Sequence, residues 1–125
     1  MSRIEGMTLL IFRVKDVERE VAFYRDGLGL AVTRHVEGRV AQFALPLCGA
    51  LELAAGGEVV PLAKDRTEVP AVPVFRVANV HEAVEQAVRH GARVVNAPFR
   101  VNEQWVAYVA DPEGHVVGLA SALAP

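Results

Sequence analysis

The chain has 125 residues, of which 52% are hydrophobic and 22% charged, and its formal net charge is −2 at pH 7. This length suits one domain with a real core, and the mixed, nearly neutral composition argues against intrinsic disorder and against a nucleic-acid-binding surface. Glu5 stands where a signal peptide would be apolar, and no apolar run reaches the roughly 20 residues of a membrane span. The single cysteine, Cys48, has no partner for an internal disulfide. We therefore expect a cytoplasmic protein that does not bind membranes.

The first half of the chain is predicted to form a strand, a helix and three further strands. Residues 7–14 have strand character, and Asp16 follows them as a helix cap. A helix is predicted over 17–28 because its apolar residues follow one stripe, although Glu20 stands where that stripe should be apolar. Gly29 ends this helix, and short strands separated by turn residues follow at 30–36, 39–46 and 50–55.

The second half repeats this order after a loop at 56–70 that is rich in Gly, Pro and charge. A strand is predicted at 71–77. The helix that begins at Val80 matches the amphipathic template, with Asn79 and Glu82 as a capping box and Gly91 as its C-cap. Three strands are predicted after it, at 92–97, 104–110 and 114–120.

An internal repeat supports this division, because Phe12-Arg13-Val14-Lys15-Asp16-Val17 is echoed by Phe75-Arg76-Val77-Ala78-Asn79-Val80. The sequence therefore predicts an α+β fold of two tandem βαβββ modules. We place module 1 at about 6–55, the linker at 56–70 and module 2 at about 71–121, in one domain that spans 1–125. One helix covers only one face of a four-stranded sheet, so we expect the two modules to share one core.

Two motifs resemble those of a known family. Val14-Lys15-Asp16-Val17, followed by Phe23-Tyr24-Arg25-Asp26-Gly27-Leu28-Gly29-Leu30, is similar to V-x-D and FY-x-x-x-LG-x, and Asp111-Pro112-Glu113-Gly114 is similar to a D-P-x-G turn. Together with the repeat, they resemble the vicinal-oxygen-chelate superfamily, which comprises glyoxalases, bleomycin-resistance proteins and extradiol dioxygenases. The resemblance implies a half-open β-barrel cup and a homodimer. It does not identify a reaction, because one fold serves many functions.

The resemblance also implies four metal-ligand positions in the cup, which fall on Leu9, Glu52, Val72 and Gly118. Only Glu52 has a donor atom, whereas a transition metal site in a protein needs at least three protein ligands. We therefore predict no metal and no cofactor in the cup.

Period-2 alternation predicts the polar neighbours of Glu52. If Leu9 faces the cup, so does Arg13, and if Val72 does, so does Arg76. Two interpretations stay open: these arginines lie in solvent at strand ends or neutralise Glu52, or they line an apolar pocket for a small polar or anionic molecule. Trp105 would either stack on that ligand or have a purely structural role, which we favour.

Three functions compete at this point. A metal-independent protein of the bleomycin-resistance kind would bind a small molecule through Arg13, Arg76, Glu52, Trp105, Leu9 and Val72. An enzyme would use Glu52 as a general base on a substrate held by an arginine. A glyoxalase-like lyase or dioxygenase with Glu52 as a metal ligand is the function against which the sequence argues.

Overall fold

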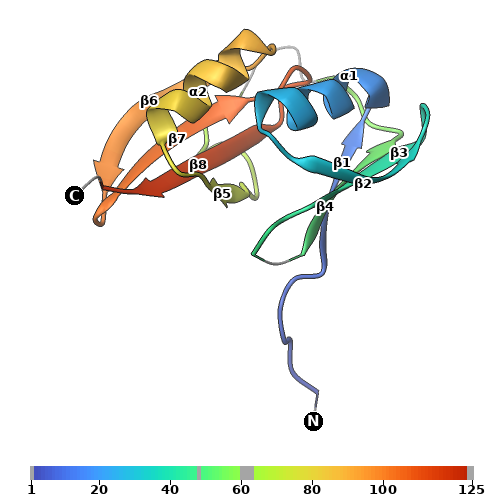
Figure 1. Cartoon of the computed structure of the whole chain (residues 1–125), viewed down its shortest axis with the longest axis horizontal. Coiled ribbons are helices and arrows are strands. Elements are labelled where there is room, and N and C mark those ends of the chain that lie inside the picture. The colour runs from blue at the N-terminus through green and yellow to red at the C-terminus, as the bar shows by residue number, and fades with distance from the viewer. Residues whose placement is uncertain (1, 48, 60–63, 124–125) are drawn as a thin grey trace.

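Two four-stranded sheets, each with one helix packed on one face, make up the computed structural model of the chain (Figure 1). The structure describes residues 2–47, 49–59 and 64–123, so Cys48 lies outside the described residues. Module 1 contains β1 (Leu9–Val14), α1 (Val17–Ala22), the π-helical turn η1 (Phe23–Gly27), β2 (Ala31–Val36), β3 (Val40–Ala44) and β4 (Ala50–Ala55). Module 2 contains β5 (Val74–Arg76), α2 (Val80–Arg89), β6 (Arg93–Val101), β7 (Gln104–Ala110) and β8 (Val116–Ala122).

The two sheets have the same topology, with strand orders β1-β4-β3-β2 and β5-β8-β7-β6. In each sheet the first strand is parallel to the fourth, and the other neighbours are antiparallel. Ile11 on β1 pairs with Glu52 on β4, and Val74 on β5 pairs with Gly118 on β8. The duplicated βαβββ order and the α+β class predicted from the sequence are confirmed.

Both helices begin at the predicted caps. The Asp16 carboxylate accepts a hydrogen bond from the Arg19 N–H at 3.1 Å, and the Asn79 side chain accepts one from the Glu82 N–H at 3.1 Å. Each cap satisfies a backbone donor that has no partner within the helix. Gly91, the predicted C-cap of α2, has the left-handed φ of 107° that glycine tolerates at such ends.

Several elements differ from the prediction: β1 and β3 are shorter than the strands predicted at 7–14 and 39–46, and the helix predicted over 17–28 is α1 followed by the π-helical turn η1. β5 has three residues instead of the seven predicted at 71–77, so Val72 lies before the strand. Pro73 explains the late start because it has no N–H to donate to a strand neighbour. β6 continues to Val101, beyond the predicted end at 97, and its register with β7 shifts on either side of Asn96.

One hydrophobic core runs through both modules, as predicted, and it is built on the faces that the helices cover. Leu51 and Leu53 are fully buried there, whereas the opposite, helix-free faces expose apolar side chains. Ile11 is 44% exposed and Val74 is 52% exposed. Neither helix in the described ranges is long and apolar enough to cross a bilayer. The open faces are therefore the surfaces on which the predicted cup residues must lie.

Candidate functional site

Glu52 lies on the helix-free face of the first sheet, between Ile11 of β1 and Gln42 of β3. The Gln42 side-chain amide donates a hydrogen bond to Glu52 Oε1 at 2.7 Å. The predicted neutralisation of Glu52 by an arginine is not seen, because no ion pair among the described residues includes it. A neutral amide binds this carboxylate instead, since Gln42 occupies the neighbouring strand in the same row.

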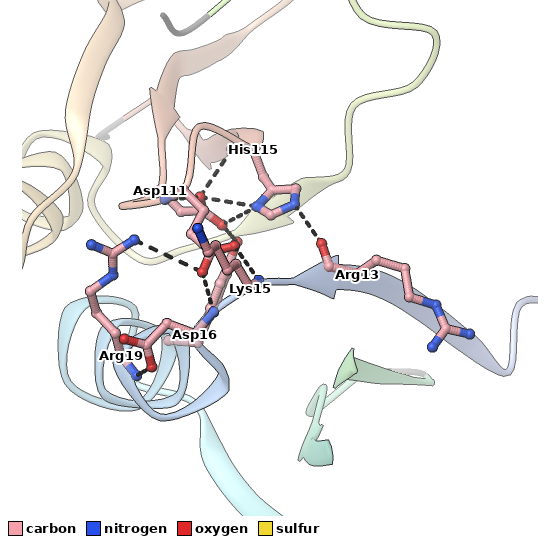
Figure 2. A network of polar contacts seen from close by, with 8 residues as sticks. Arg13, Lys15, Asp16, Arg19, Asp111 and His115 are labelled. Atoms are coloured by element: carbon pink, nitrogen blue, oxygen red, sulfur yellow. Dashed lines mark hydrogen bonds and ion pairs between the residues drawn. The ribbon is translucent and has the colours of Figure 1, made fainter. Parts of the chain in front are cut away.

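The two repeated arginines occupy equivalent places. Arg13 pairs with Ala54 on β4, and Arg76 pairs with Ala120 on β8, one row beyond Glu52 and Gly118 respectively. Both side chains are exposed. Figure 2 shows the Arg13 side chain extending away from the polar network that its own backbone joins. The structure therefore places Arg13 on the same open face as Glu52 and places Arg76 on the other sheet.

The four positions implied by the resemblance do not fit a metal ion. Leu9 and Val72 have no donor atoms, and a Cβ atom added at Gly118 would lie 2.9 Å from Val74 Cγ2 and 3.0 Å from Tyr108 Cε1. The space into which a ligand at position 118 would project is already filled. Glu52 alone cannot hold a transition metal.

The helix-free face of the second sheet is partly covered by the linker. The guanidinium carbon of Arg66 lies 5.4 Å from the ring centre of Phe99 and 5.3 Å from that of Tyr108, which is cation–π distance. Sequence reasoning missed Arg66, because an arginine in a charged loop gives no signal of what it covers. Arg66 therefore covers the part of the second face that Phe99 and Tyr108 occupy.

Trp105 lies on the helix-covered side of the second sheet. Its ring meets the His81 ring of α2 edge-on, with 4.8 Å between ring centres, and it packs against the core. This position favours the structural role, and it separates Trp105 from the face that carries the candidate ligand residues. We leave Trp105 out of the proposed site.

An apolar groove of about 630 Å³ lies where the β3–β4 turn of module 1 faces β5 of module 2. The turn contributes Leu45, Pro46 and Leu47, and the strand contributes Arg76 as the charged group on the rim. Arg76 therefore lies beside a mostly apolar groove whose lining includes neither Glu52 nor Arg13, whereas the sequence interpretation put all three in one pocket.

A buried polar cluster joins the two modules on the helix side (Figure 2). The Tyr24 hydroxyl donates to Asp111 Oδ2 at 2.7 Å, and His115 Nδ1 lies 2.9 Å from the same oxygen. Glu113 accepts the backbone N–H groups of Lys15 and Asp16, each at 2.7 Å. The D-P-x-G turn was predicted only as a tight turn. Through Glu113 it also forms hydrogen bonds that join module 2 to the start of α1.

Burial and neighbouring charges change the pKa values of this cluster. Burial, followed by the repulsion of Asp111, raises the pKa of Glu20 to about 10. Burial alone would raise the pKa of Asp111 and lower that of His115, but the hydrogen bond and attraction between the two outweigh it. The pKa of Asp111 therefore lies below its ordinary value and that of His115 lies above. The sequence signalled Glu20 as a break in the apolar stripe, but not its neighbours.

These features define a class: a duplicated βαβββ protein whose two sheets each leave one face free of helices. The family model for the Glyoxalase/Bleomycin resistance protein/Dioxygenase superfamily matches residues 6–119, and the chain belongs to this superfamily. No curated protein sequence matches the chain.

Solved structures agree on the fold. A glyoxalase-related enzyme from Fulvimarina pelagi has a TM-score of 0.75 at 18% identity, over 94% of this chain and 88% of that one. A glyoxalase/bleomycin resistance protein/dioxygenase family enzyme from Burkholderia phytofirmans PsJN has a TM-score of 0.73 at 17% identity, over 93% and 98%. The fosfomycin resistance protein FosX from Listeria monocytogenes has a TM-score of 0.75 at 16% identity, over 97% and 94%. At these identities the similarity establishes the fold alone.

Proposed function

We propose that the protein binds a small polar or anionic molecule on the open face of its first sheet, without a metal ion in the cup. The observation that carries this proposal is the pair formed by Glu52 and Gln42 within a mostly apolar, open surface. Ligand sites are commonly built in this way, with few orienting polar groups on apolar walls. The bleomycin-resistance branch of the superfamily offers the nearest functional analogy.

The polar groups of this face suit a ligand that carries both a donor and an acceptor. Glu52 Oε1 accepts from Gln42, and Oε2 has no hydrogen bond to another described residue. A ligand hydroxyl or amine would donate to Oε2, and the exposed guanidinium of Arg13, one row along, would attract an anionic group. Arg76 would act in the same way beside the apolar groove.

A homodimer is part of the proposal. The concave faces expose Ile11 and Val74 at 44% and 52%, and a second copy would bury these side chains while closing the cup. Size-exclusion chromatography with light scattering would give a dimer mass for the native chain. Val74→Asp, which puts a charge on that face, would give a monomer. A monomer for the native chain at micromolar concentration would refute the dimer.

A reducing, cytoplasmic location is also proposed, and it rests on the use of a single cysteine in the whole sequence.

A thermal-shift screen in the presence of EDTA tests the binding function. Fosfomycin, a small phosphonate, is a rational first compound because two of the structural neighbours are fosfomycin resistance proteins. We expect a ligand to raise the melting temperature of the native chain, because binding to the folded state alone stabilises it. The rise should be lost in Arg13→Ala or Glu52→Gln and kept in Trp105→Phe. Stabilisation that depends on an added metal and on Glu52 would contradict metal independence.

The second candidate is an enzyme in which Glu52 is a general base. The free Oε2 atom of Glu52 favours it, because this oxygen is available to a substrate proton. Product formation by the native chain, lost in Glu52→Gln although the ligand still binds, would establish catalysis. Binding by the native chain without any product would leave the binding function alone.

A further inference from the structure

The polar cluster between α1 and the β7–β8 turn contains one buried carboxyl group that accepts no hydrogen bond from a described residue and that, when protonated, can donate one to Asp111. Glu20, on α1, is 0% exposed, and neither of its carboxylate oxygens has a hydrogen-bond donor among the described residues. An ionised carboxylate without donors is costly to bury. Either a proton or a cation must accompany Glu20 in this position.

Two further ligand atoms face Glu20. One oxygen of Glu20, one oxygen of Asp111 and a ring nitrogen of His115 all lie within 4.8 Å of one another. Atoms that share a tetrahedral Zn²⁺ at bond lengths of about 2.0–2.2 Å are roughly 3.5 Å apart. Small shifts, including a widening of the 2.9 Å between His115 Nδ1 and Asp111 Oδ2, would bring all three into a coordination sphere. One imidazole and two carboxylates form a donor set suited to Zn²⁺ and similar divalent transition metals.

Two of these three side chains, His115 and Asp111, are held in place by surrounding groups, as metal ligands commonly are. His115 Nε2 lies 3.2 Å from the carbonyl oxygen of Arg13 and can donate to it, which directs Nδ1 towards the acids (Figure 2). The Tyr24 hydroxyl and the N–H groups of Glu113 and His115 hold the Asp111 carboxylate in place. A histidine ligand commonly donates its second N–H to a backbone carbonyl in this way.

We propose that Glu20, Asp111 and His115 bind one divalent transition metal ion, Zn²⁺ in the first instance, which ties α1 of module 1 to the β7–β8 turn of module 2. The bound ion takes the place of the proton on Glu20 and of the proton between His115 Nδ1 and Asp111, and both protons pass to the solvent. The side chain of His115 is 18% exposed, whereas that of Asp111 is fully buried, so the ion enters from the His115 side. This site is separate from the cup, because it lies on the helix-covered side of the sheets and Glu52 lies on the other.

Metal titration of the full chain, purified without a polyhistidine tag and treated with chelator, tests the site. Calorimetry with Zn²⁺, and the visible absorption of Co²⁺, would be recorded for the native chain, Glu20→Gln, His115→Gln and Glu52→Gln. We expect one ion per chain in the native protein and in Glu52→Gln, with affinity at least about tenfold lower in Glu20→Gln and His115→Gln. Protons released into the buffer should accompany binding in the native chain.

Three outcomes would overturn this site, and only the last of them would also contradict the proposed function. Failure of Zn²⁺, Mn²⁺, Co²⁺ and Fe²⁺ to bind the native chain would mean that a proton alone accompanies Glu20. Equal binding in Glu20→Gln and the native chain would place the ion elsewhere. Binding lost only in Glu52→Gln would place it in the cup. Far-ultraviolet circular dichroism would verify that each variant is folded, and His115→Gln provides the test if Glu20→Gln is not.

Discussion

The turns that join the third and fourth strands of the two modules occupy matching places but have opposite chemistry. Counted back from the matching positions Glu52 and Gly118, Leu47 in the first turn corresponds to Glu113 in the second. Glu113 is fully buried and accepts two backbone N–H groups of the other module, whereas Leu47 is 75% exposed and lines the apolar groove. Polar bonds close one junction between the modules, and the equivalent junction stays open as a cavity.

The helical segments of the two modules also differ in polarity, with polar side chains in module 1 and alanines in module 2. In the repeat, Glu20 of α1 and Tyr24 of η1 correspond to Ala83 and Ala87 of α2. Glu20 and Tyr24 contribute a carboxyl and a hydroxyl to the closed junction, while the two alanine side chains have no polar atoms to contribute. Duplication thus supplies two equivalent places in the scaffold, and the residues in which the copies differ decide which becomes a polar joint and which a groove.

The largest expected effect concerns the pH dependence of stability, measured in the presence of chelator. Because the pKa of Glu20 is raised from 4.5 to about 10, the folded chain binds more protons than the unfolded chain between these values. Its contribution to stability is therefore complete below pH 4.5 and is lost as the pH rises towards 10. Glu20→Gln removes this loss, which amounts to at most about 1.4 kcal/mol per pH unit.

Urea unfolding of Glu20→Gln and the native chain at pH 5 and pH 8 gives the measurement. We expect the variant to gain stability relative to the native chain on going from pH 5 to pH 8. His115, whose pKa is raised, also loses stabilising charge as the pH rises, but it does so in both proteins. An unchanged difference between the two proteins across this range would show that Glu20 is ionised in the fold.

A second prediction compares the two turns directly. Glu113→Ala removes the charged acceptor of two part-buried hydrogen bonds from the N–H groups of Lys15 and Asp16, so we expect it to lower the free energy of unfolding by about 3 kcal/mol. Leu47→Ala, at the matching position, should cost less than about 0.5 kcal/mol because the side chain is exposed. Chemical denaturation measures both, and equal losses would mean that the closed junction adds no stability.

A third prediction concerns the matching positions Glu52 and Gly118. Gly118→Glu should destabilise the fold by about 2 kcal/mol, because its Cβ would press on Val74 and Tyr108. Tyr108→Ala in the same chain should recover part of this loss by making space. Glu52→Gln, which keeps the shape and the hydrogen-bonding capacity towards Gln42, should change stability by less than about 1 kcal/mol. A stable Gly118→Glu variant would mean that the second face can accept a ligand residue after all.

The fold was predictable from the sequence because its signals are local. Asp16 and Asn79 cap their helices where the pattern predicts them, and the repeat alone gave the duplicated topology. Contacts between distant segments were not predictable: the partner of Glu52 is Gln42, which sequence reasoning did not consider, and no arginine forms an ion pair with it within the described ranges. Alternation along one strand fixes a face, but not which neighbouring strand supplies the partner. The sequence marked Glu20 only as a polar residue in the apolar stripe of its helix, and did not indicate its buried neighbours.

The smallest expected effect tests whether Arg66 of the linker covers the helix-free face of the second sheet. Arg66 lies over Phe99 and Tyr108, and such a contact at a partly exposed site contributes about 0.5–1 kcal/mol. Arg66→Ala should lower the free energy of unfolding by that amount, and Arg66→Lys by less, because lysine keeps the charge but not the planar group. Thermal unfolding measures both, and iodide quenching of tyrosine fluorescence reports whether Tyr108 becomes accessible, since the other tyrosine, Tyr24, is fully buried. Increased quenching in Arg66→Ala would show that the linker closes the second face, and unchanged quenching would mean that other residues close it.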